Sequence, residues 1–243
     1  MTSFRVSVAY LAIAAGVLVA VPASAQSGRV TASINFGVQG GSGDFTQRLT
    51  PSIYDETAEI DIAQNYENGP LFDIGADVLI FGNLGAGLSY SRTSGDGVAA
   101  IAARIPDPVF FDRPRGAAAS VDGLDHSEGA VHLKVFYRFA ATPKMDISVG
   151  VGPTFFSVKQ QLIDAVDVAE PTPTITPRVE EASDSPVGVN FGADVTYMVT
   201  ELVGAGVLLR YATGSADLVT PSGNSVSLDA GGFQFAAGLR VRF

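Results

Sequence analysis

The sequence contains no cysteine and only two histidines. The fold therefore has to be stabilised without disulfides, and a zinc site, which needs several thiolate or imidazole ligands, is not expected. Basic residues are also scarce, because 15 Lys and Arg stand against 25 Asp and Glu, for a formal net charge of −10. A surface of this sign repels phosphate, so we expect no nucleic acid partner.

Long apolar runs are almost absent as well. Only the stretch from Val6 to Val21 approaches the roughly 18 apolar residues that a transmembrane helix requires. It follows Arg5 and precedes Ala23-Ser24-Ala25, which has the small-x-small pattern of a cleavage site. These features predict a signal peptide over residues 1–25, rather than a membrane anchor, and a mature domain over 26–243 that begins at Gln26.

Apolar residues nevertheless make up 47% of the chain, and they follow a period of two. In the terminal stretch GGFQFAAGLRVRF, one face carries Phe233, Phe235, Ala237, Leu239, Val241 and Phe243, and the other face carries polar or small residues. A period of two is the signature of a β-strand. The same alternation predicts seven further strands, at 30–38, 72–80, 84–91, 131–139, 147–155, 187–197 and 203–211.

The connections between these eight segments alternate between short and long. Short links are expected at 82–83, 140–144 and 199–201, and longer links at 39–70, 93–127, 157–186 and 213–225. Aromatic residues gather on the apolar face at both strand ends, with Tyr90, Phe155 and Tyr211 at the long links and Tyr137, Phe139, Tyr197 and Phe243 at the short turns. Two aromatic girdles indicate that the apolar face is turned toward lipid.

We therefore predict an all-β fold, an eight-stranded antiparallel up-and-down transmembrane β-barrel with short periplasmic turns and long extracellular loops. A soluble barrel of the lipocalin kind would show the same alternation with its apolar row inside. That alternative leaves the unequal lengths of the connections unexplained.

This pattern resembles the eight-stranded outer-membrane β-barrels of Gram-negative bacteria, of the OmpA, OmpX and OmpW type. The resemblance covers Arg29 to Phe243 as a pattern rather than as identities. It implies a place in the outer membrane, contact with outer-membrane lipid and lipopolysaccharide, and insertion by the barrel-assembly machinery. In such proteins the assembly signal lies in the last strand, which assigns that role to Phe235, Leu239, Val241 and Phe243.

The face opposite the apolar one carries charges of both signs. It holds Asp73, Asp77, Glu128, His132, Lys134, Arg138, Asp194, Arg210, Arg240 and Arg242. The interior of an eight-stranded barrel is just wide enough to be filled by side chains, and unpaired buried charge is costly. We expect these residues to pair and to plug the lumen; the alternative is a narrow pore for small solutes or ions.

One short motif, His126-Ser127-Glu128, combines a base, a hydroxyl and a carboxylate. An enzyme that modifies lipid A would use such groups, but neighbouring residues of a strand point to opposite faces, so His126 and Ser127 should not converge. The glycine-rich stretches such as GNLGAGLSY lie within predicted strands, where phosphate-binding geometry is missing. We therefore expect neither an enzyme nor a cofactor.

The long links carry most of the acidic residues. The alternation from Glu59 to Ala63 predicts a hairpin above the membrane, and the stretch EPTPTITP is expected to be stiff and extended. In the link IPDPVFFDRPR, we expect Phe110, Phe111, Arg113 and Arg115 to fold over the barrel mouth or to form a contact site. The sequence thus favours a structural or surface-interaction module whose external ligand it does not identify.

Overall fold

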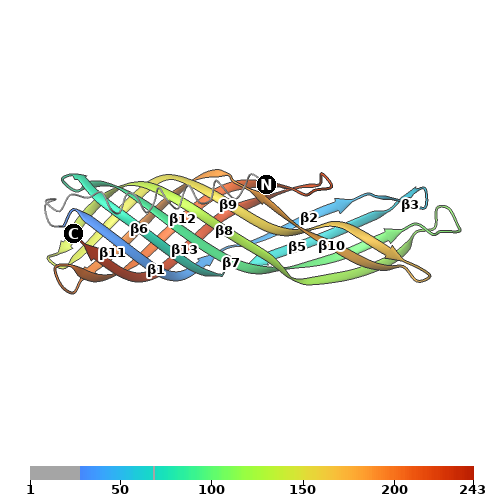
Figure 1. Cartoon of the computed structure of the whole chain (residues 1–243), viewed down its shortest axis with the longest axis horizontal. Coiled ribbons are helices and arrows are strands. Elements are labelled where there is room, and N and C mark those ends of the chain that lie inside the picture. Colours follow the sequence, from blue (N-terminus) through green and yellow to red (C-terminus); the bar gives the residue numbers. More distant parts are fainter. Residues whose placement is uncertain (1–27, 68) are drawn as a thin grey trace.

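The computed structural model describes residues 28–67 and 69–243, so the predicted signal peptide and its cleavage site lie outside the described residues. Eight strands form a closed ring, in which each pairs antiparallel with the next and the last pairs with the first (Figure 1). These strands are β1 (Val30–Gly40), β6 (Pro70–Phe81), β7 (Leu84–Ile105), β8 (Arg115–Thr142), β9 (Met145–Ala169), β11 (Val187–Met198), β12 (Val203–Val219) and β13 (Ser225–Arg242). The predicted fold class is confirmed.

The ring closes where the last strand meets the first. Ile34 of β1 lies opposite Leu239 of β13 on one side and opposite Ile74 of β6 on the other. The backbone N–H of Gly28 donates to the carbonyl of Phe243 over 2.7 Å, so both ends of the described chain lie at the short turns. A closed ring pairs its backbone groups around the full circumference, which is what a strand structure requires inside lipid.

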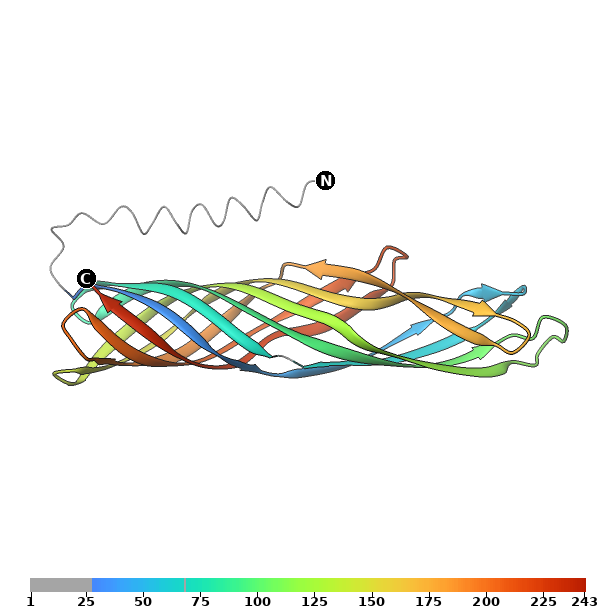
Figure 2. The same ribbon diagram turned by 60° about the horizontal axis from the view of Figure 1, so that its bottom comes forward.

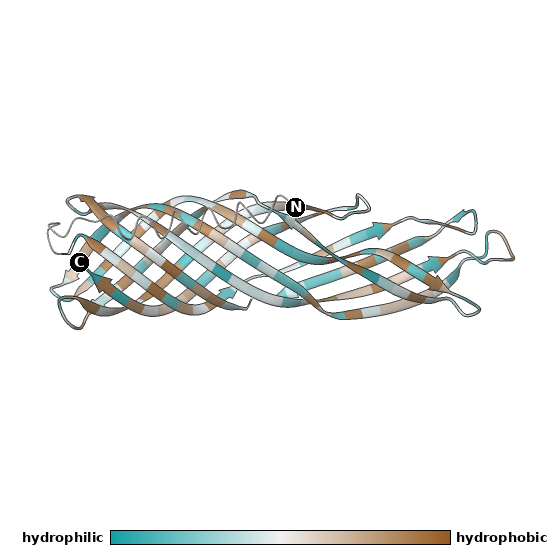
Figure 3. Cartoon of the chain, viewed as in Figure 1, coloured by the Kyte–Doolittle hydropathy of each residue, from teal (hydrophilic) through white to brown (hydrophobic). Residues whose placement is uncertain are grey.

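In the half of the barrel next to these turns, apolar residues alternate with polar or small ones along the strands (Figure 3), and many of the apolar ones are exposed on the outside. The outward face of this half includes strongly exposed residues such as Phe36, Val151, Phe191 and Leu239. Aromatic rings meet across the outer wall, with centroids 5.3 Å apart for Phe36 and Phe72 and 5.4 Å apart for Phe191 and Tyr211. This outward apolar surface is the lipid-facing band of a transmembrane barrel. Among the described residues, no helix is long and apolar enough to cross a membrane.

Beyond this band the strands continue, but the polarity of their two faces is exchanged. The outward residues of β7 change from the apolar Leu84, Leu88 and Tyr90 to a mixed set that holds Arg92, Ser94, Asp96 and Arg104 beside Val98, Ala100 and Ala102. Its inward residues change from Ser89, Ser91 and Thr93 to Ala99, Ile101, Ala103 and Ile105. The same alternate residues of β7 continue to face outward, while the surroundings of this outer face change from lipid to water. The predicted strand end near Ser91 was therefore wrong, because β7 runs fourteen residues further, to Ile105.

The exchanged strands form an extension that projects from the barrel on the side opposite the short turns (Figure 2). It also contains β2 (Ser42–Leu49), β3 (Ser52–Ile53), β4 (Glu56–Thr57), β5 (Glu59–Glu67) and β10 (Thr174–Asp184). The hairpin of β2 and β5 pairs with β7, which confirms the hairpin predicted from Glu59 to Ala63. The predicted extended stretch is divided between a turn at 170–173 and β10, which pairs with β9.

The interior of the extension is filled by apolar side chains. We call the cluster farther from the membrane the distal core; its buried members are Leu49, Ala58, Ile60, Ile62, Ala99, Ile101, Ala103, Ile105, Leu124, Ile163 and Ile175. A second buried cluster lies nearer the band and includes Phe156, Val158, Leu162, Leu218 and Leu228. Burial of these side chains stabilises the extension in the way a soluble protein is stabilised. The long connections are therefore folded structure with short turns at their tips.

Candidate functional site

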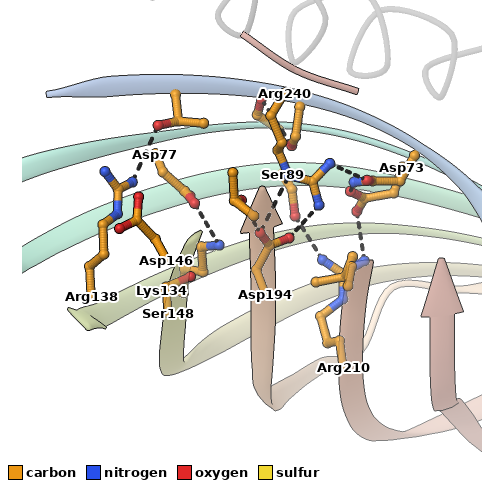
Figure 4. A pocket seen from close by; sticks show the side chains of 16 residues that line it. Asp73, Asp77, Ser89, Lys134, Arg138, Asp146, Ser148, Asp194, Arg210 and Arg240 are labelled. Atoms are coloured by element: carbon orange, nitrogen blue, oxygen red, sulfur yellow. Dashed lines mark hydrogen bonds and ion pairs between the residues drawn. The ribbon is translucent and has the colours of Figure 1, made fainter. Parts of the chain in front are cut away.

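The lumen inside the lipid-facing band is crossed by ion pairs (Figure 4). Asp73 of β6 binds Arg210 of β12 over 2.7 Å, and Asp77 of β6 binds Lys134 of β8 over 3.0 Å. Arg240 of β13 pairs with Asp194 of β11, and Arg242 pairs with Asp146 over 2.5 Å. The charged residues predicted for this interior are thus brought together across the barrel rather than along one wall. Such pairing offsets the cost of removing the charges from water.

Asp146 was missed by the sequence reasoning, although a signal for it was present. It has the same parity as Ser148, which lies on the inward face of the strand that contains both. Arg138, which was expected in the network, donates to the hydroxyl of Thr31 over 3.3 Å and lies 5.7 Å from the ring centroid of Phe136. It lies at the turn end of the lumen, where side chains are only partly buried.

Glycines on the inward face make room for these long side chains. A Cβ at Gly206 of β12 would lie 2.7 Å from Cζ of Arg240, closer than real Cβ atoms approach other atoms. The guanidinium of Arg240 therefore lies flat against this part of the wall, and its side chain is fully buried. This agrees with the view that the inward glycines relieve crowding within a narrow barrel.

The ion pairs leave little free space. The cavity among Asp73, Asp77, Lys134, Asp194 and Arg210 measures about 30 Å³. A cavity of that size holds a few water molecules, which polar walls of this kind can bind. A hydrated ion or a metabolite does not fit between these side chains in this conformation.

A buried chain of hydrogen bonds closes the lumen on the side of the extension. Nε of Arg210 donates to Gln234, which donates to Gln39, and Gln39 donates to Glu128 over 2.8 Å. Because the guanidinium of an arginine can only donate, the side-chain oxygens of Gln234 and Gln39 accept and their NH₂ groups donate to the next residue. Gly231 N also donates to Glu128, and His126 Nε2 lies 3.1 Å from the other carboxylate oxygen. Glu128 thus accepts hydrogen bonds from β1 and β13 and lies beside the imidazole of His126.

The two histidines are both buried inside the barrel. His126 is stacked on Tyr66 with ring centroids 4.1 Å apart, and its Nδ1 lies 2.7 Å from Gln160. His132 lies 2.9 Å from both Ser91 and Thr154 through its two ring nitrogens. Ser127 lies on the outward face of β8 and is in register with Lys159 of β9, while His126 lies on the inward face. The strand parity therefore separates His126 from the hydroxyl of Ser127, as expected from the sequence.

The predicted assembly signal lies on the lipid side of the last strand. Phe235, Leu239 and Phe243 are exposed on the outer wall, and Val241 shares their parity. Val241 lies opposite Ala32 of β1 and Val203 of β12, at the seam that closes the ring. Their role in assembly stays a prediction.

At the far end of the extension, hydrogen bonds join three connections, which we call the tip cluster. They are the β3–β4 turn with Tyr54, the loop between β7 and β8 that leads to Arg115, and the β9–β10 turn with Glu170. The centre of the tip cluster is Arg115, which binds both carboxylate oxygens of Glu170, with Nη–O distances of 2.8 and 2.5 Å. Arg115 also donates to the carbonyl of Pro106, while the hydroxyl of Tyr54 donates to Glu170 over 3.0 Å. The hydrogen bond from Arg115 lowers the pKa of Glu170, so the carboxylate stays charged at neutral pH.

The aromatic side chains of the loop between β7 and β8 do not fold over the barrel mouth, and of the two expected alternatives the contact site stays a prediction. Phe110 and Phe111 are 56% and 72% exposed and lie in the loop between β7 and β8. Arg113 lies over the ring of Phe110, 5.4 Å from its centroid. Arg115 differs from these three residues because its guanidinium is used to bind Glu170 inside the tip cluster.

Comparison with known proteins finds a structural likeness to outer-membrane proteins and no function. No family model matches the chain, and no curated protein matches it. Three outer-membrane proteins are similar in structure: OprG from Pseudomonas aeruginosa (9% identity, TM-score 0.49, 90% of this chain and 97% of that chain), a major outer membrane protein from Thermus thermophilus (12%, 0.47, 90% and 100%) and Neisserial surface protein A (13%, 0.44, 90% and 99%). At these identities and TM-scores, their activities carry no argument for this protein. Closed ring, lipid-facing band and polar lumen together make the chain an eight-stranded β-barrel of the outer-membrane type.

Proposed function

We propose that the protein is an outer-membrane barrel with a closed lumen, which displays its extension and tip cluster at the cell surface for contact with an external partner. The observation that carries this proposal is the occupied lumen, where the cavities among the ion pairs measure only about 30 and 20 Å³. We further propose that the chain is exported with cleavage before Gln26, inserted by the barrel-assembly machinery through its last strand, and surrounded by outer-membrane lipid and lipopolysaccharide.

Two barriers in series support a closed lumen over a pore. The first is the ion-pair network of the lipid-facing band, and the second is the apolar filling of the extension. An ion that entered along the inside of the extension would have to displace buried apolar side chains before it reached the polar part. Moving a charge through such a region without compensation is very costly.

The closed lumen predicts that the refolded protein does not conduct in a planar bilayer. Folding is checked first by the difference in gel migration between heated and unheated samples, which is typical of an intact barrel. The expected record is a silent membrane at moderate voltage, since the lumen is blocked at two levels. Steady openings whose conductance scales with salt concentration would contradict a closed lumen and favour a narrow pore instead.

The proposed orientation predicts which side of the membrane each turn faces. Because the chain has no cysteine, a single Val109→Cys or Asn83→Cys substitution gives one unique thiol. On intact cells, a membrane-impermeant maleimide should label Cys at position 109 of the tip and leave position 83 of the β6–β7 turn unlabelled. Position 83 should react only after the outer membrane is permeabilised. The opposite result would show that the extension faces the periplasm and exclude a role at the cell surface.

A further inference from the structure

The tip cluster combines rigidity, exposed apolar side chains and a negative border. From this combination we infer that it is a docking site for a protein segment that carries an apolar side chain beside Lys or Arg. This inference rests on the proposed function, and it adds the position of the site and the chemistry of its partner.

The rigidity of the site comes from hydrogen bonds between three turns. Arg115 connects the β7–β8 loop to Glu170 of the β9–β10 turn, and Tyr54 connects the β3–β4 turn to the same carboxylate. Glu56 accepts the backbone N–H of Asp112 over 3.3 Å, which attaches the middle of the loop to the β3–β4 turn. A loop held from both sides loses little conformational entropy on binding, so more of its contact energy appears as affinity.

The apex of the same loop is built to expose apolar side chains. The carboxylate of Asp107 accepts the backbone N–H groups of Val109 and Phe110 over 2.9 and 3.1 Å, which fixes the turn that projects them. Val109 and Phe111 are 73% and 72% exposed, although they lie far beyond the lipid-facing band. The band explains the other exposed aromatics of the barrel wall, whereas lipid of the same membrane cannot explain these. Aromatic side chains at the centre of a patch are frequent anchors of protein interfaces.

The charges around the apex select the sign of the partner. Asp107 and Glu170 are compensated by Arg115, with ion pairs of 3.4 and 2.5 Å. The same turns also carry Asp55, Glu56 and Asp112, against the single further cation Arg113. The border is therefore negative, which attracts Lys and Arg and repels both an anionic lipid surface and a second copy of the same tip. An apolar centre with a negative border fits a cationic, partly apolar polypeptide.

The test is a selection with a random twelve-residue peptide library displayed on phage, against the full-length mature barrel in lipid nanodiscs. The double variant Phe110→Ser/Phe111→Ser removes the anchors but keeps Asp107, Arg115 and Glu170, so the fold of the tip is preserved. Hydrogen exchange of residues 106–115 in this variant shows whether the tip has stayed ordered. Vesicles of phosphatidylcholine, with and without phosphatidylglycerol, serve as the lipid probe.

The expected result is enrichment of peptides in which Lys or Arg adjoins an aromatic or aliphatic residue. These peptides should bind at least ten times more weakly to the double variant, and also more weakly as salt rises from about 0.05 to 0.5 M. Peptides that bind both proteins equally, an absence of any enriched peptide, or tip-dependent binding of the vesicles would each overturn the inference. Enriched peptides that bind elsewhere on the extension would leave the proposed surface role intact while excluding the tip as its site.

Discussion

Replacing Asp73 by asparagine should lower the free energy of unfolding by about 3–5 kcal/mol. The substitution keeps an oxygen that accepts from Asn35 but removes the charge that compensates Arg210, whose side chain is nearly fully buried. A guanidinium without a counter-charge inside the barrel has lost its solvation without a replacement, and this is the reason for the large effect. The measurement is urea unfolding of the refolded barrel in lipid vesicles, followed by tyrosine fluorescence.

Two further variants separate charge compensation from other causes. Adding Arg210→Met to the Asp73→Asn variant removes the unpaired charge, so we expect most of the lost stability to return. Asp61→Asn breaks an ion pair with Arg48 in which both side chains are more than half exposed, and it should cost no more than about 1 kcal/mol. Equal losses from Asp73→Asn and Asp61→Asn, or no recovery in the double variant, would show that the pair across the lumen is not what stabilises the barrel.

The alternation of side chains was sufficient to predict the ring of strands and, within the predicted segments, the face on which each residue lies. Arg240 and Asp194 were both expected inside, and both are there. Their pairing was not predictable, because partners meet across the lumen and their relative heights depend on the tilt and stagger of all eight strands. The same limit applies to Gln39 and Gln234, neutral residues whose importance comes only from lying between Arg210 and Glu128.

The ends of the strands were not predicted because each strand was expected to keep its apolar residues on a single face. At Arg92 the outer face of β7 becomes polar, and from Ala99 the inner face becomes apolar. A strand that passes from lipid into water has to make this exchange if it stays folded, since the outer face must match each solvent in turn. When the apolar residues of an alternating segment move from one face to the other, the pattern therefore indicates a strand that continues beyond the membrane. The same reversal is visible in β12 after Tyr211 and in β13 before Phe233.

The distal core makes a second prediction of large effect, which concerns the extension alone. Ile101 of β7 is 3% exposed and lies between Ile62 of β5 and Ala119 of β8. Shortening it to alanine should destabilise the extension by about 2–5 kcal/mol, because it removes buried apolar atoms and leaves a cavity. Hydrogen exchange measured by mass spectrometry should show faster exchange in 59–67 and 96–121. The part of the ring inside the lipid-facing band, which contributes no residue to this cluster, should keep its exchange rates and its heat-modifiable migration.

The neighbouring residue provides the matched control. Ala102 lies on the outer face of the same strand, so Ala102→Ser should change stability by less than about 0.5 kcal/mol. If both variants behave alike, the apolar residues of the extension are not packed as a core. If Ile101→Ala also abolishes the heat-modifiable form, the ring and the extension fold as one cooperative unit. An effect confined to the extension would instead mean that the ring and the tip are stabilised separately. The proposed contact surface would then tolerate sequence changes without loss of the barrel that carries it.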